Sequence, residues 1–338
     1  MRVLIVGGAG FIGSNYADRR LAAGDEVVVF DNLSRPKTDL NLEWLRSRHG
    51  GRLTFIKGDV RDYRALEQVV AGVDVVAHLA GQVAVTTSIV DPREDFEINA
   101  LGTFNVLEAV RQHRPEAALI FASTNKVYGG LEDVSVAEEP TRYTLPDLPN
   151  GVPETQPLDF HSPYGCSKGA ADQYVRDYAR VYGMRTVVFR QSCIYGTRQF
   201  GVEDQGWVAH FCISAAIGRP ITIYGDGKQV RDVLWIDDLL NAYDLALQHI
   251  DVAGGRIYNV GGGPANTMSI WAEFQPILQP LMSSPVEVSY REARVGDQKV
   301  YVSNVDKARR ELGWAPAVSV REGVGRLWRW VNDNRDLF

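Results

Sequence analysis

The sequence predicts an α/β fold, with a doubly wound parallel sheet followed by a smaller C-terminal lobe. Three observations predict it. Apolar runs of strand length alternate with segments of helical periodicity over the first 190 residues. A glycine-rich turn, G-x-x-G-x-x-G, separates the first run from the first helical segment. Beyond residue 190 the alternation becomes irregular, which favours a second lobe of different architecture.

The elements of the first part can be predicted in chain order. Continuous apolar runs are typical of strands buried on both faces of a parallel sheet. They predict strands over residues 2–6, 26–30, 53–57, 73–79, 118–122 and 186–189. Helical spacing predicts helices over residues 13–23, 63–71, 92–112 and 163–182. Residues 130–163, rich in Pro, Asp, Glu and Asn, are expected to form a long surface loop of the kind that is often functional.

The second part predicts shorter elements. Strands are expected near residues 221–223 and 257–260, and helices near residues 208–217, 236–248, 268–279 and 305–312. We therefore predict a first domain over residues 1–190 and a substrate-binding lobe over residues 191–338 that is partly interleaved with it. The 338 residues are about twice the length of a typical domain, which agrees with this division.

The composition excludes several classes of protein. With 45% hydrophobic and 23% charged residues, the chain is an ordinary globular protein rather than a disordered or coiled-coil one. Its 36 basic and 42 acidic residues give a net charge of -6, so no nucleic-acid partner is expected. No apolar run approaches the roughly 18 residues of a membrane span, and the first residues lack the pattern of a signal peptide. We expect a cytoplasmic protein without a membrane partner.

The cysteines predict neither a disulfide framework nor a metal site. There are three of them, Cys166, Cys193 and Cys212, and they lie far apart without C-x-x-C spacing or a histidine cluster.

The glycine-rich turn predicts a dinucleotide site. In a Rossmann-type unit Gly7 permits the tight turn, Gly10 lets the backbone approach a pyrophosphate, and Gly13 allows close packing of helix on strand. Asp31 ends the second strand about 20 residues further on, where a carboxylate binds the adenine-ribose 2'-hydroxyl and repels a 2'-phosphate. This position favours NAD, although Arg35 and Lys37 leave NADP open. A structural turn with an unrelated aspartate is the alternative interpretation.

Two residues after the third strand have two interpretations. Asp59 and Val60 would lie beside the adenine if the sheet is wound as predicted, whereas a solvated turn is the alternative. His78 lies inside an apolar strand, so it is interpreted as a packed core histidine rather than a catalytic group.

The pair Tyr164 and Lys168 predicts acid/base chemistry. Their i, i+4 spacing places both side chains on one face of a helix. There the ammonium, together with a nicotinamide's positive charge, would lower the pKa of the tyrosine so that it exchanges a proton with a hydroxyl while a hydride passes to or from the nicotinamide. Alone, the pair would be interpreted as a surface helix pair. Thr124 after the fifth strand and the upstream glycine turn make it a candidate catalytic set.

These residues, in this order, resemble the extended short-chain dehydrogenase/reductase family of NAD-dependent nucleotide-sugar epimerases and dehydratases. The resemblance covers nearly the whole chain. More narrowly, HLAGQVAVTTS (78–88), STNKVYG (123–129), LDFHSPYGCSKGAADQY (158–174) and YGTRQF (195–200) followed by DQGW (204–207) are similar to the group of CDP-paratose 2-epimerases, also called CDP-tyvelose 2-epimerases.

Two departures from other branches narrow the resemblance. The family's dehydratases carry an Asp-Glu pair after the catalytic Thr for elimination of water, whereas Asn125 and Lys126 follow Thr124 here. The familiar 4-epimerases usually carry Asn two residues before Tyr-Gly in F-R-x-x-N-x-Y-G, whereas this chain has Cys193. The first difference argues against a dehydratase, and the second argues against a 4-epimerase.

The resemblance implies a set of site residues. The catalytic residues would be Thr124, Tyr164 and Lys168. Tyr164 and Lys168 would also contact the cofactor. The other cofactor contacts would come from Gly7, Gly10, Phe11, Ile12, Gly13, Asp31, Asn32, Asp59, Val60, Leu79, Ala80 and Asn99. Substrate contacts would come from Gln82, Thr87, Asn125, Lys126, Cys193, Tyr224, Arg231, Arg294 and Asp297, where the arginines pair with the diphosphate and Asp297 accepts from a ribose hydroxyl. A core role for Tyr224 is the alternative.

The implied function is an isomerase with bound NAD that inverts C2 of a CDP-linked deoxyhexose through a transient ketone. Alternatives are a UDP-sugar 4-epimerase, another dehydratase or reductase of the family, and a noncatalytic NAD-binding regulator. The nucleoside-diphosphate sugar is the expected partner. A homodimer or homotetramer is also expected, because the resemblance pairs the helices over residues 92–112 and 163–182 with their symmetry mates.

Overall fold

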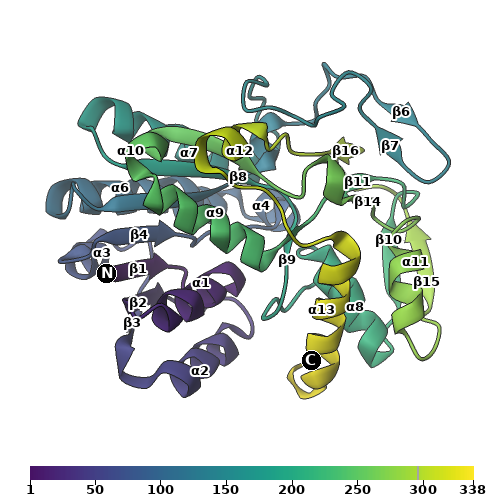
Figure 1. Cartoon of the computed structure of the whole chain (residues 1–338), viewed down its shortest axis with the longest axis horizontal. Helices are drawn as coiled ribbons and strands as arrows, with labels where there is room; N and C mark the ends of the chain where they lie inside the picture. The colour runs from purple at the N-terminus through teal and green to yellow at the C-terminus, as the bar shows by residue number, and fades with distance from the viewer. Residues whose placement is uncertain (295–296) are drawn as a thin grey trace. The chain divides into compact units, whose positions relative to one another are not determined.

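The computed structural model describes residues 1–294 and 297–338 and contains one seven-stranded sheet and several small ones (Figure 1). The large sheet has the order β13-β8-β5-β4-β1-β2-β3. Its strands are β1 Arg2–Val6, β2 Glu26–Asp31, β3 Leu53–Lys57, β4 Val75–His78, β5 Ala118–Thr124, β8 Thr186–Gln191 and β13 Arg256–Val260. Strand β1 pairs in parallel with both β2 and β4, so the winding reverses between β1 and β4. Ligands of such sheets bind at this reversal, beyond the carboxyl ends of the strands.

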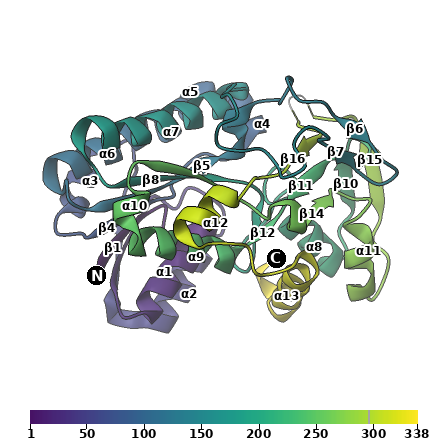
Figure 2. The same ribbon diagram turned by 45° about the horizontal axis from the view of Figure 1, so that its top comes forward.

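Helices cover both faces of this sheet, as the prediction of a doubly wound fold required. Figure 2 shows α3 Tyr63–Val70, α6 Gly102–His113 and α7 Ser162–Tyr182 on one face, and α1 Phe11–Ala22 and α2 Thr38–His49 on the other. The shorter helices of this part are α4 Val85–Val90, α5 Pro92–Phe96, η1 Gly50–Arg52, the π-helix η2 Glu97–Leu101 and α10 Ile250–Ala253.

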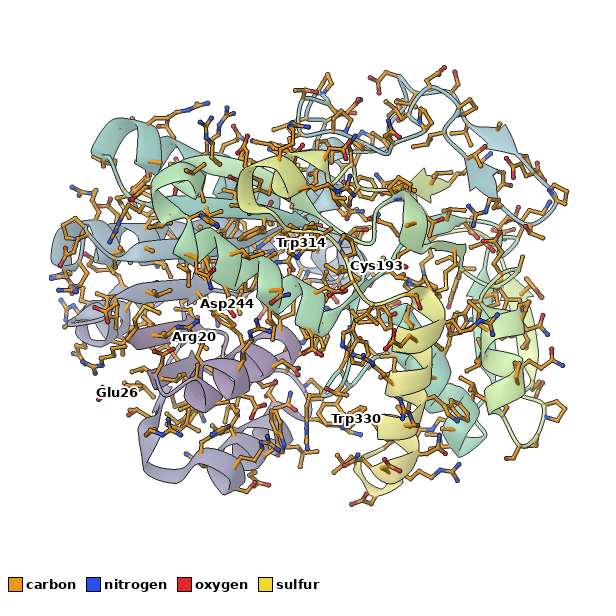
Figure 3. The ribbon with its side chains drawn as sticks, viewed as in Figure 1. Arg20, Glu26, Cys193, Asp244, Trp314 and Trp330 are labelled. Atoms are coloured by element: carbon orange, nitrogen blue, oxygen red, sulfur yellow. The ribbon has the colours of Figure 1, made fainter. Side chains whose placement is uncertain are left out.

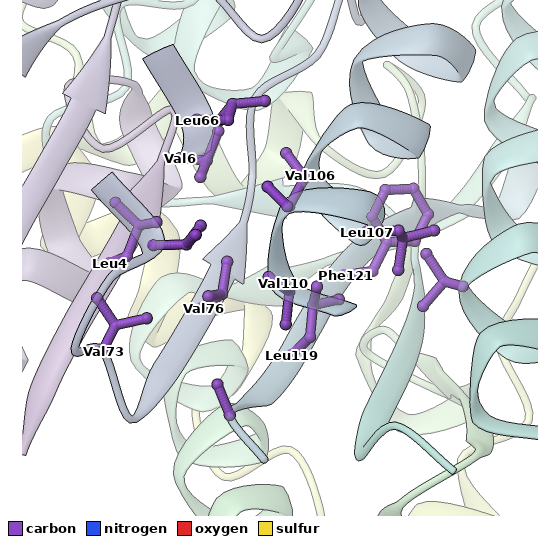
Figure 4. Packing of buried hydrophobic residues seen from close by; sticks show 14 of the residues in the cluster. Leu4, Val6, Leu66, Val73, Val76, Val106, Leu107, Val110, Leu119 and Phe121 are labelled. Atoms are coloured by element: carbon purple, nitrogen blue, oxygen red, sulfur yellow. The ribbon is translucent and has the colours of Figure 1, made fainter. Parts of the chain in front are cut away.

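The core of the large sheet is made of aliphatic side chains from the strands and from α3 and α6 (Figure 4). Leu4, Val76 and Leu119 on the strands pack with Leu66 and Val106 on the helices, and each is at most 1% exposed. Burial of such side chains contributes about 1.5–3 kcal/mol each. This core fixes the strand ends at which the candidate site lies.

The chain folds into two compact units, and their bounds differ from the predicted division at residue 190. Unit 1 comprises residues 1–127, 162–190 and 243–258, and unit 2 comprises residues 128–161, 191–242 and 259–338. Asp244, labelled with Arg20 in Figure 3, pairs with Arg20 at 2.9 Å and with Arg19 at 2.6 Å, so residues 243–258 are tied to α1 within unit 1. Residues 128–161 belong to unit 2, where Val152 N donates to Val302 O at 2.7 Å.

Unit 2 contains short strands and the remaining helices. The strands are β6 Ala137–Glu138, β7 Tyr143–Thr144, β9 Ile194–Tyr195, β10 Ile221–Tyr224, β11 Val230–Asp232, β12 Leu234–Trp235, β14 Thr267–Ser269, β15 Val288–Arg291 and β16 Val300–Tyr301. The helices are α8 Trp207–Ile217, α11 Gln275–Leu278, α12 Asp306–Leu312 and α13 Val320–Asp333, with short 3-10 turns at η4 Pro264–Asn266, η5 Gln279–Leu281 and η6 Arg335–Leu337. Helix α9 Ile236–Gln248 and the turn η3 Asn125–Tyr128 contain residues of both units.

One predicted helix of this part is wrong. Residues 268–279 begin as strand β14, in which Met268 pairs with Arg231 of β11, and become helical only at α11. Ser269 N donates to Glu273 Oε2 at 2.9 Å, and Glu273 N donates to Ser269 Oγ at 2.9 Å, which closes a turn between the two elements. Across the described residues, no helix has the length and apolar character needed to span a bilayer.

Candidate active site

The glycine turn after β1 has the close backbone contacts that the sequence predicted. Gly7 has φ +83°, and a Cβ there would lie 2.5 Å from Ala80 N. A Cβ at Gly13 would lie 2.2 Å from Gly7 O, so only glycine lets α1 approach the turn. The first N–H groups of a helix have no acceptor within it, and Phe11 and Ile12 begin α1 here. This backbone cradle fits the pyrophosphate of a dinucleotide.

Asp31 is fixed at the carboxyl end of β2. Its Oδ2 accepts from Ala9 N at 3.0 Å and its Oδ1 accepts from Leu33 N at 2.8 Å. Burial raises the pKa of this carboxyl, and the two backbone hydrogen bonds oppose the rise. Each carboxylate oxygen has a second acceptor position, so both ribose hydroxyls of an adenosine can donate to Asp31.

The neighbours of Asp31 form a second polar group. Asp59 accepts from Asn32 Nδ2 at 2.9 Å and from Arg61 Nε and Nη2 at 2.9 and 2.8 Å. The Arg61 hydrogen bonds are the main reason that the pKa of Asp59 falls to about 2. Val60 is 6% exposed, and a Cβ at Gly102 would lie 2.6 Å from it. Asp59 is therefore an ionised, locally paired carboxylate beside Asn32.

The segment after β4 lies beside the glycine turn. Leu79 N donates to Val6 O at 2.8 Å, which holds the predicted cofactor residues Leu79 and Ala80 at the point where the sheet reverses. A Cβ at the next residue, Gly81, would lie 2.9 Å from Asn99 Oδ1 and 3.8 Å from Lys168 Nζ. Asn99 and Lys168 therefore face the same short stretch of backbone.

The three predicted catalytic side chains are all buried in unit 1. Tyr164 is 8% exposed, Thr124 7% and Lys168 5%. The hydroxyl of Tyr164 is hydrogen-bonded to the Thr124 side chain. Lys168 Nζ donates to Ala122 O at 2.7 Å and lies 4.3 Å from the centre of the Phe121 ring. Helix α7 and the end of β5 thus bring the predicted set together.

Burial determines the protonation of this set in the chain alone. Burial raises the pKa of Tyr164 to about 12, while the hydrogen bond from Thr124 opposes the rise. Burial lowers the pKa of Lys168 to about 8, against the charges of Asp172 and Asp95. The chain's own groups therefore leave Tyr164 a neutral phenol. The predicted lowering of the Tyr164 pKa needs the positive charge of a bound nicotinamide together with the ammonium, so it stays a prediction for the enzyme with its cofactor.

His78 has the packed role that the sequence predicted. It is 1% exposed, and its Nε2 lies 3.0 Å from Thr103 Oγ1. Burial lowers its pKa to about 3, so the ring is neutral.

Sequence reasoning missed two buried carboxylates near this set. Asp172 pairs with Arg190 at 2.9 Å and accepts from Ser123 Oγ at 2.7 Å, and both members of the ion pair are at most 2% exposed. Asp95 is 0% exposed and accepts from Ser167 Oγ at 2.5 Å. Ser167 stands inside the predicted Tyr-x-x-x-Lys segment, which was the only signal for this contact.

The predicted substrate residues of unit 1 lie around Thr124 and after β4. Asn125 is 7% exposed, and its Oδ1 lies 3.4 Å from Thr124 Oγ1. Lys126 N donates to Thr124 Oγ1 at 3.2 Å. Gln82 is partly buried and bonded to the backbone of Ala84, whereas Thr87 is exposed on α4.

The predicted nucleotide residues belong to unit 2. Arg231 is 5% exposed and pairs with Asp297 at 2.6 Å. Arg294 pairs with Asp204 at 2.9 Å, and its guanidinium carbon lies 4.0 Å from the centre of the Tyr224 ring. Cys193 O accepts from Leu234 N at 3.0 Å and is labelled in Figure 3. Both arginines are thus paired with carboxylates that an anionic ligand would have to replace.

Comparison with known proteins gives consistent results. Residues 4–327 match the family model described as GDP-mannose 4,6 dehydratase. The chain is 46% identical to a CDP-paratose 2-epimerase of Salmonella typhi over 98% of this chain and 99% of the relative.

Two solved structures are similar over nearly the whole chain. One is a UDP-glucose 4-epimerase of Thermotoga maritima with UDP-glucose, with a TM-score of 0.85, 29% identity and coverage of 99% of this chain and 100% of that one. The other is a dTDP-glucose 4,6-dehydratase of Streptomyces venezuelae with NAD bound, with a TM-score of 0.84, 30% identity and coverage of 100% and 99%. The fold and family predicted from the sequence are confirmed. This chain belongs to the extended short-chain dehydrogenase/reductase family of NAD-dependent nucleotide-sugar epimerases and dehydratases.

Proposed function

We propose that this enzyme inverts C2 of a CDP-linked deoxyhexose, of the CDP-paratose/CDP-tyvelose type. The observation that carries the proposal is the buried set Thr124, Tyr164 and Lys168, in which the tyrosine hydroxyl bonds to the threonine. The 46% identity with a CDP-paratose 2-epimerase over 98% of the chain supports cytosine as the nucleotide base and C2 as the carbon that is inverted.

The residues at the glycine turn fit NAD as the cofactor of this reaction. Gly7, Gly10 and Gly13 with the start of α1 would hold its pyrophosphate, and Asp31 would accept from the adenine ribose. A 2'-phosphate would meet this carboxylate, which favours NAD over NADP. When bound, NAD supplies reversible oxidation of a secondary alcohol.

The chain's own residues supply orientation and proton transfer. Thr124 would hold the sugar hydroxyl beside Tyr164. With the charges of Lys168 and a bound nicotinamide favouring its phenolate, Tyr164 would take the hydroxyl proton and later return it. Lys168, held by Ala122 O, places a positive charge one helical turn from the tyrosine. The oxidation removes a hydrogen from the sugar carbon and leaves a ketone. Return of this hydrogen to the other face of the same carbon inverts its configuration.

The residues after Thr124 favour inversion over elimination of water. Elimination needs an acid and a base near the leaving hydroxyl, and the positions of the dehydratases' carboxylate pair are taken by Asn125 and Lys126. In unit 2, Arg231 and Arg294 would pair with the diphosphate, while Tyr224 would contact the base.

The first test identifies both cofactor and reaction. Purified enzyme should release mainly NAD on denaturation and should interconvert CDP-paratose and CDP-tyvelose, with UDP- and GDP-sugars as comparison substrates. In deuterated water the product should carry no deuterium at C2, because Tyr164 exchanges its proton with the hydroxyl rather than with carbon. NMR of the product reads both outcomes.

Three results would contradict this proposal. Stoichiometric deuterium at C2 would mean deprotonation at carbon, inversion only at C4 of a UDP-sugar would indicate a 4-epimerase, and recovery of mainly NADP would contradict the role of Asp31.

We also propose that the enzyme is a homodimer or homotetramer built on α6 and α7. Phe96 is 57% exposed, Phe104 38% and Tyr174 49%, whereas Leu107 is fully buried against the sheet. The rings of Phe104 and Tyr174 lie 5.9 Å apart, so the two helices present one continuous aromatic surface. Exposed aromatic side chains gathered in this way are typical of an interface.

Light scattering should therefore give at least twice the chain mass of 37.5 kDa. Phe104→Glu should lower the mass toward one chain, because a charge would be buried in the interface. Val202→Glu is a matched control, since Val202 is 52% exposed and belongs to unit 2, whereas α6 and α7 belong to unit 1. A wild-type mass near 37.5 kDa at all concentrations would contradict the proposal.

A further inference from the structure

Asp95 in α5 joins three segments that carry candidate site residues. Its Oδ2 accepts from Ser167 Oγ on α7 at 2.5 Å. Its Oδ1 accepts from Gln82 Nε2 after β4 at 3.0 Å and from Asn99 Nδ2 in the π-helix η2 at 3.1 Å. The side chain is 0% exposed, so no solvent competes for these bonds. Burial of a carboxylate is costly unless donors surround it, and these three donors do so.

The orientation of the Gln82 amide follows from this carboxylate. Gln82 Nε2 also donates to Ala84 O at 2.8 Å, and Gln82 Oε1 accepts from Ala84 N at 2.5 Å. An amide nitrogen has two hydrogens and an amide oxygen has two lone pairs. Both hydrogens are therefore used within the chain, and only one lone pair of Oε1 remains. Gln82, predicted to bind the substrate, can then act only as an acceptor for a hydroxyl.

The Asn99 amide is oriented in the same way. Its Nδ2 is directed to Asp95 Oδ1, to Gln82 O at 3.0 Å and to Ser167 Oγ at 3.2 Å. Its Oδ1 is buried and makes no hydrogen bond with the described residues. The position of a Cβ on Gly81 would be 2.9 Å from this oxygen and 3.8 Å from Lys168 Nζ. A buried acceptor of this kind calls for a functional explanation, and this one is held beside the catalytic lysine.

We propose that Asp95 is a positioning residue of the epimerase site, whose carboxylate fixes the Gln82 and Asn99 amides and ties them to the helix that carries Tyr164 and Lys168. The inference rests on the proposed function, since it concerns the same site. Only a carboxylate accepts from all three donors, because an asparagine with its oxygen at the Oδ1 position would turn its own N–H₂ toward Ser167 Oγ, which donates to Oδ2 here.

The charge of Asp95 affects the pKa of Tyr164, and a residue with a purely structural role would leave that pKa unchanged. The groups that act on the pKa of Tyr164 are Thr124 from β5, Asp95 from α5 and Arg35 from the segment after β2. Asp95 raises the pKa of Tyr164, and Arg35 lowers it. Asp95 and Asp172 both raise the pKa of Lys168. Removal of the Asp95 charge should therefore make Tyr164 more acidic.

The test compares Asp95→Asn with Ser167→Ala in the NAD-loaded full-length enzyme. For Asp95→Asn we expect kcat to fall about 10-fold to 100-fold, because small displacements of a positioned group are costly, with a smaller change in KM. The acid limb of the pH profile and the ¹³C NMR titration of labelled Tyr164, assigned with Tyr164→Phe, should both move to lower pH. Ser167→Ala removes the shortest bond but keeps the charge, so it should slow kcat and leave the titration in place.

Each outcome decides the proposal. An unchanged Tyr164 titration in Asp95→Asn, or full activity of Ser167→Ala, would overturn it, and the second result is available even if Asp95→Asn does not fold. The NMR titration needs no substrate. If it moves as expected while the wild-type enzyme converts no CDP-sugar, the proposed function fails and the role of Asp95 in the site stands.

Discussion

Tyr164→Phe should reduce turnover about 100-fold to 10,000-fold, which is the usual contribution of a positioned acid/base group. The substitution removes only the hydroxyl that bonds to Thr124, and the ring remains in its buried position at 8% exposure. NAD content should stay close to that of the wild type, because the glycine turn and Asp31 are unchanged. Single-turnover kinetics and the nucleotide released on denaturation measure the two quantities separately.

A matched control is Tyr178→Phe on the same helix. Tyr178 is also buried, at 6%, and its hydroxyl donates to Glu108 at 2.7 Å, away from Thr124. This variant should lose a hydrogen bond worth about 0.5–1.5 kcal/mol of stability and keep its turnover. Near-normal activity of Tyr164→Phe would show that another group takes the hydroxyl proton.

Most strands of the large sheet were predictable because they are buried on both faces, and the edge strand β3 was predicted although its side chains are only partly buried or exposed. A strand in such a sheet is a continuous apolar run, and that signal does not depend on the neighbouring elements. Residues 2–6 and 53–57 were predicted with the bounds of β1 and β3, and residues 73–79 exceed β4 by a few residues only.

The helices that were missed or misplaced depend on tertiary contacts. Residues 92–112 are periodic throughout, yet the helix contains the π-helical turn Glu97–Leu101, in which Asn99 reaches Asp95 and Ser167. Helix α13 was not predicted, because Gly323 and Gly325 weaken the helical pattern. Gly323 is needed there, since a Cβ would lie 2.0 Å from the Tyr195 hydroxyl.

One overlooked local signal predicted this helix. Ser319 caps α13 by accepting from Glu322 N at 3.3 Å, and the S-x-x-E pattern of a capping box is visible in the sequence.

Site residues were predictable where a sequence motif combines with the end of a strand. They were not predictable where a residue's role depends on its burial in the folded chain. Tyr164, Lys168 and Thr124 follow from spacing and from the position of β5. Asp95 lies in the charged stretch DPREDFE, which is typical of a solvated helix face. Its complete burial depends on Asn99 one turn away and on two donors from other segments, Gln82 and Ser167, and no property of one segment indicates such a convergence.

The ionisation of Lys168 leads to the last prediction. The ammonium is fully present below its pKa of about 8 and is lost as the pH rises through that value, because burial disfavours the charged form. If the reaction needs this charge, activity should therefore fall as the pH rises above about 8. Asp172 and Asp95 act against burial, so loss of either carboxylate would move the alkaline limb to lower pH.

Lys168→Met tests this argument, since methionine has a similar shape without the charge or the donor to Ala122 O. We expect turnover to fall about 100-fold or more, together with weaker retention of NAD, because the family resemblance places this lysine on the nicotinamide ribose. Lys168→Arg keeps a positive charge at all accessible pH values. It should retain part of the activity and lose the alkaline limb of the pH profile. An alkaline limb that stays in place in Lys168→Arg would assign it to another group, and full NAD retention in Lys168→Met would confine the lysine to charge stabilisation.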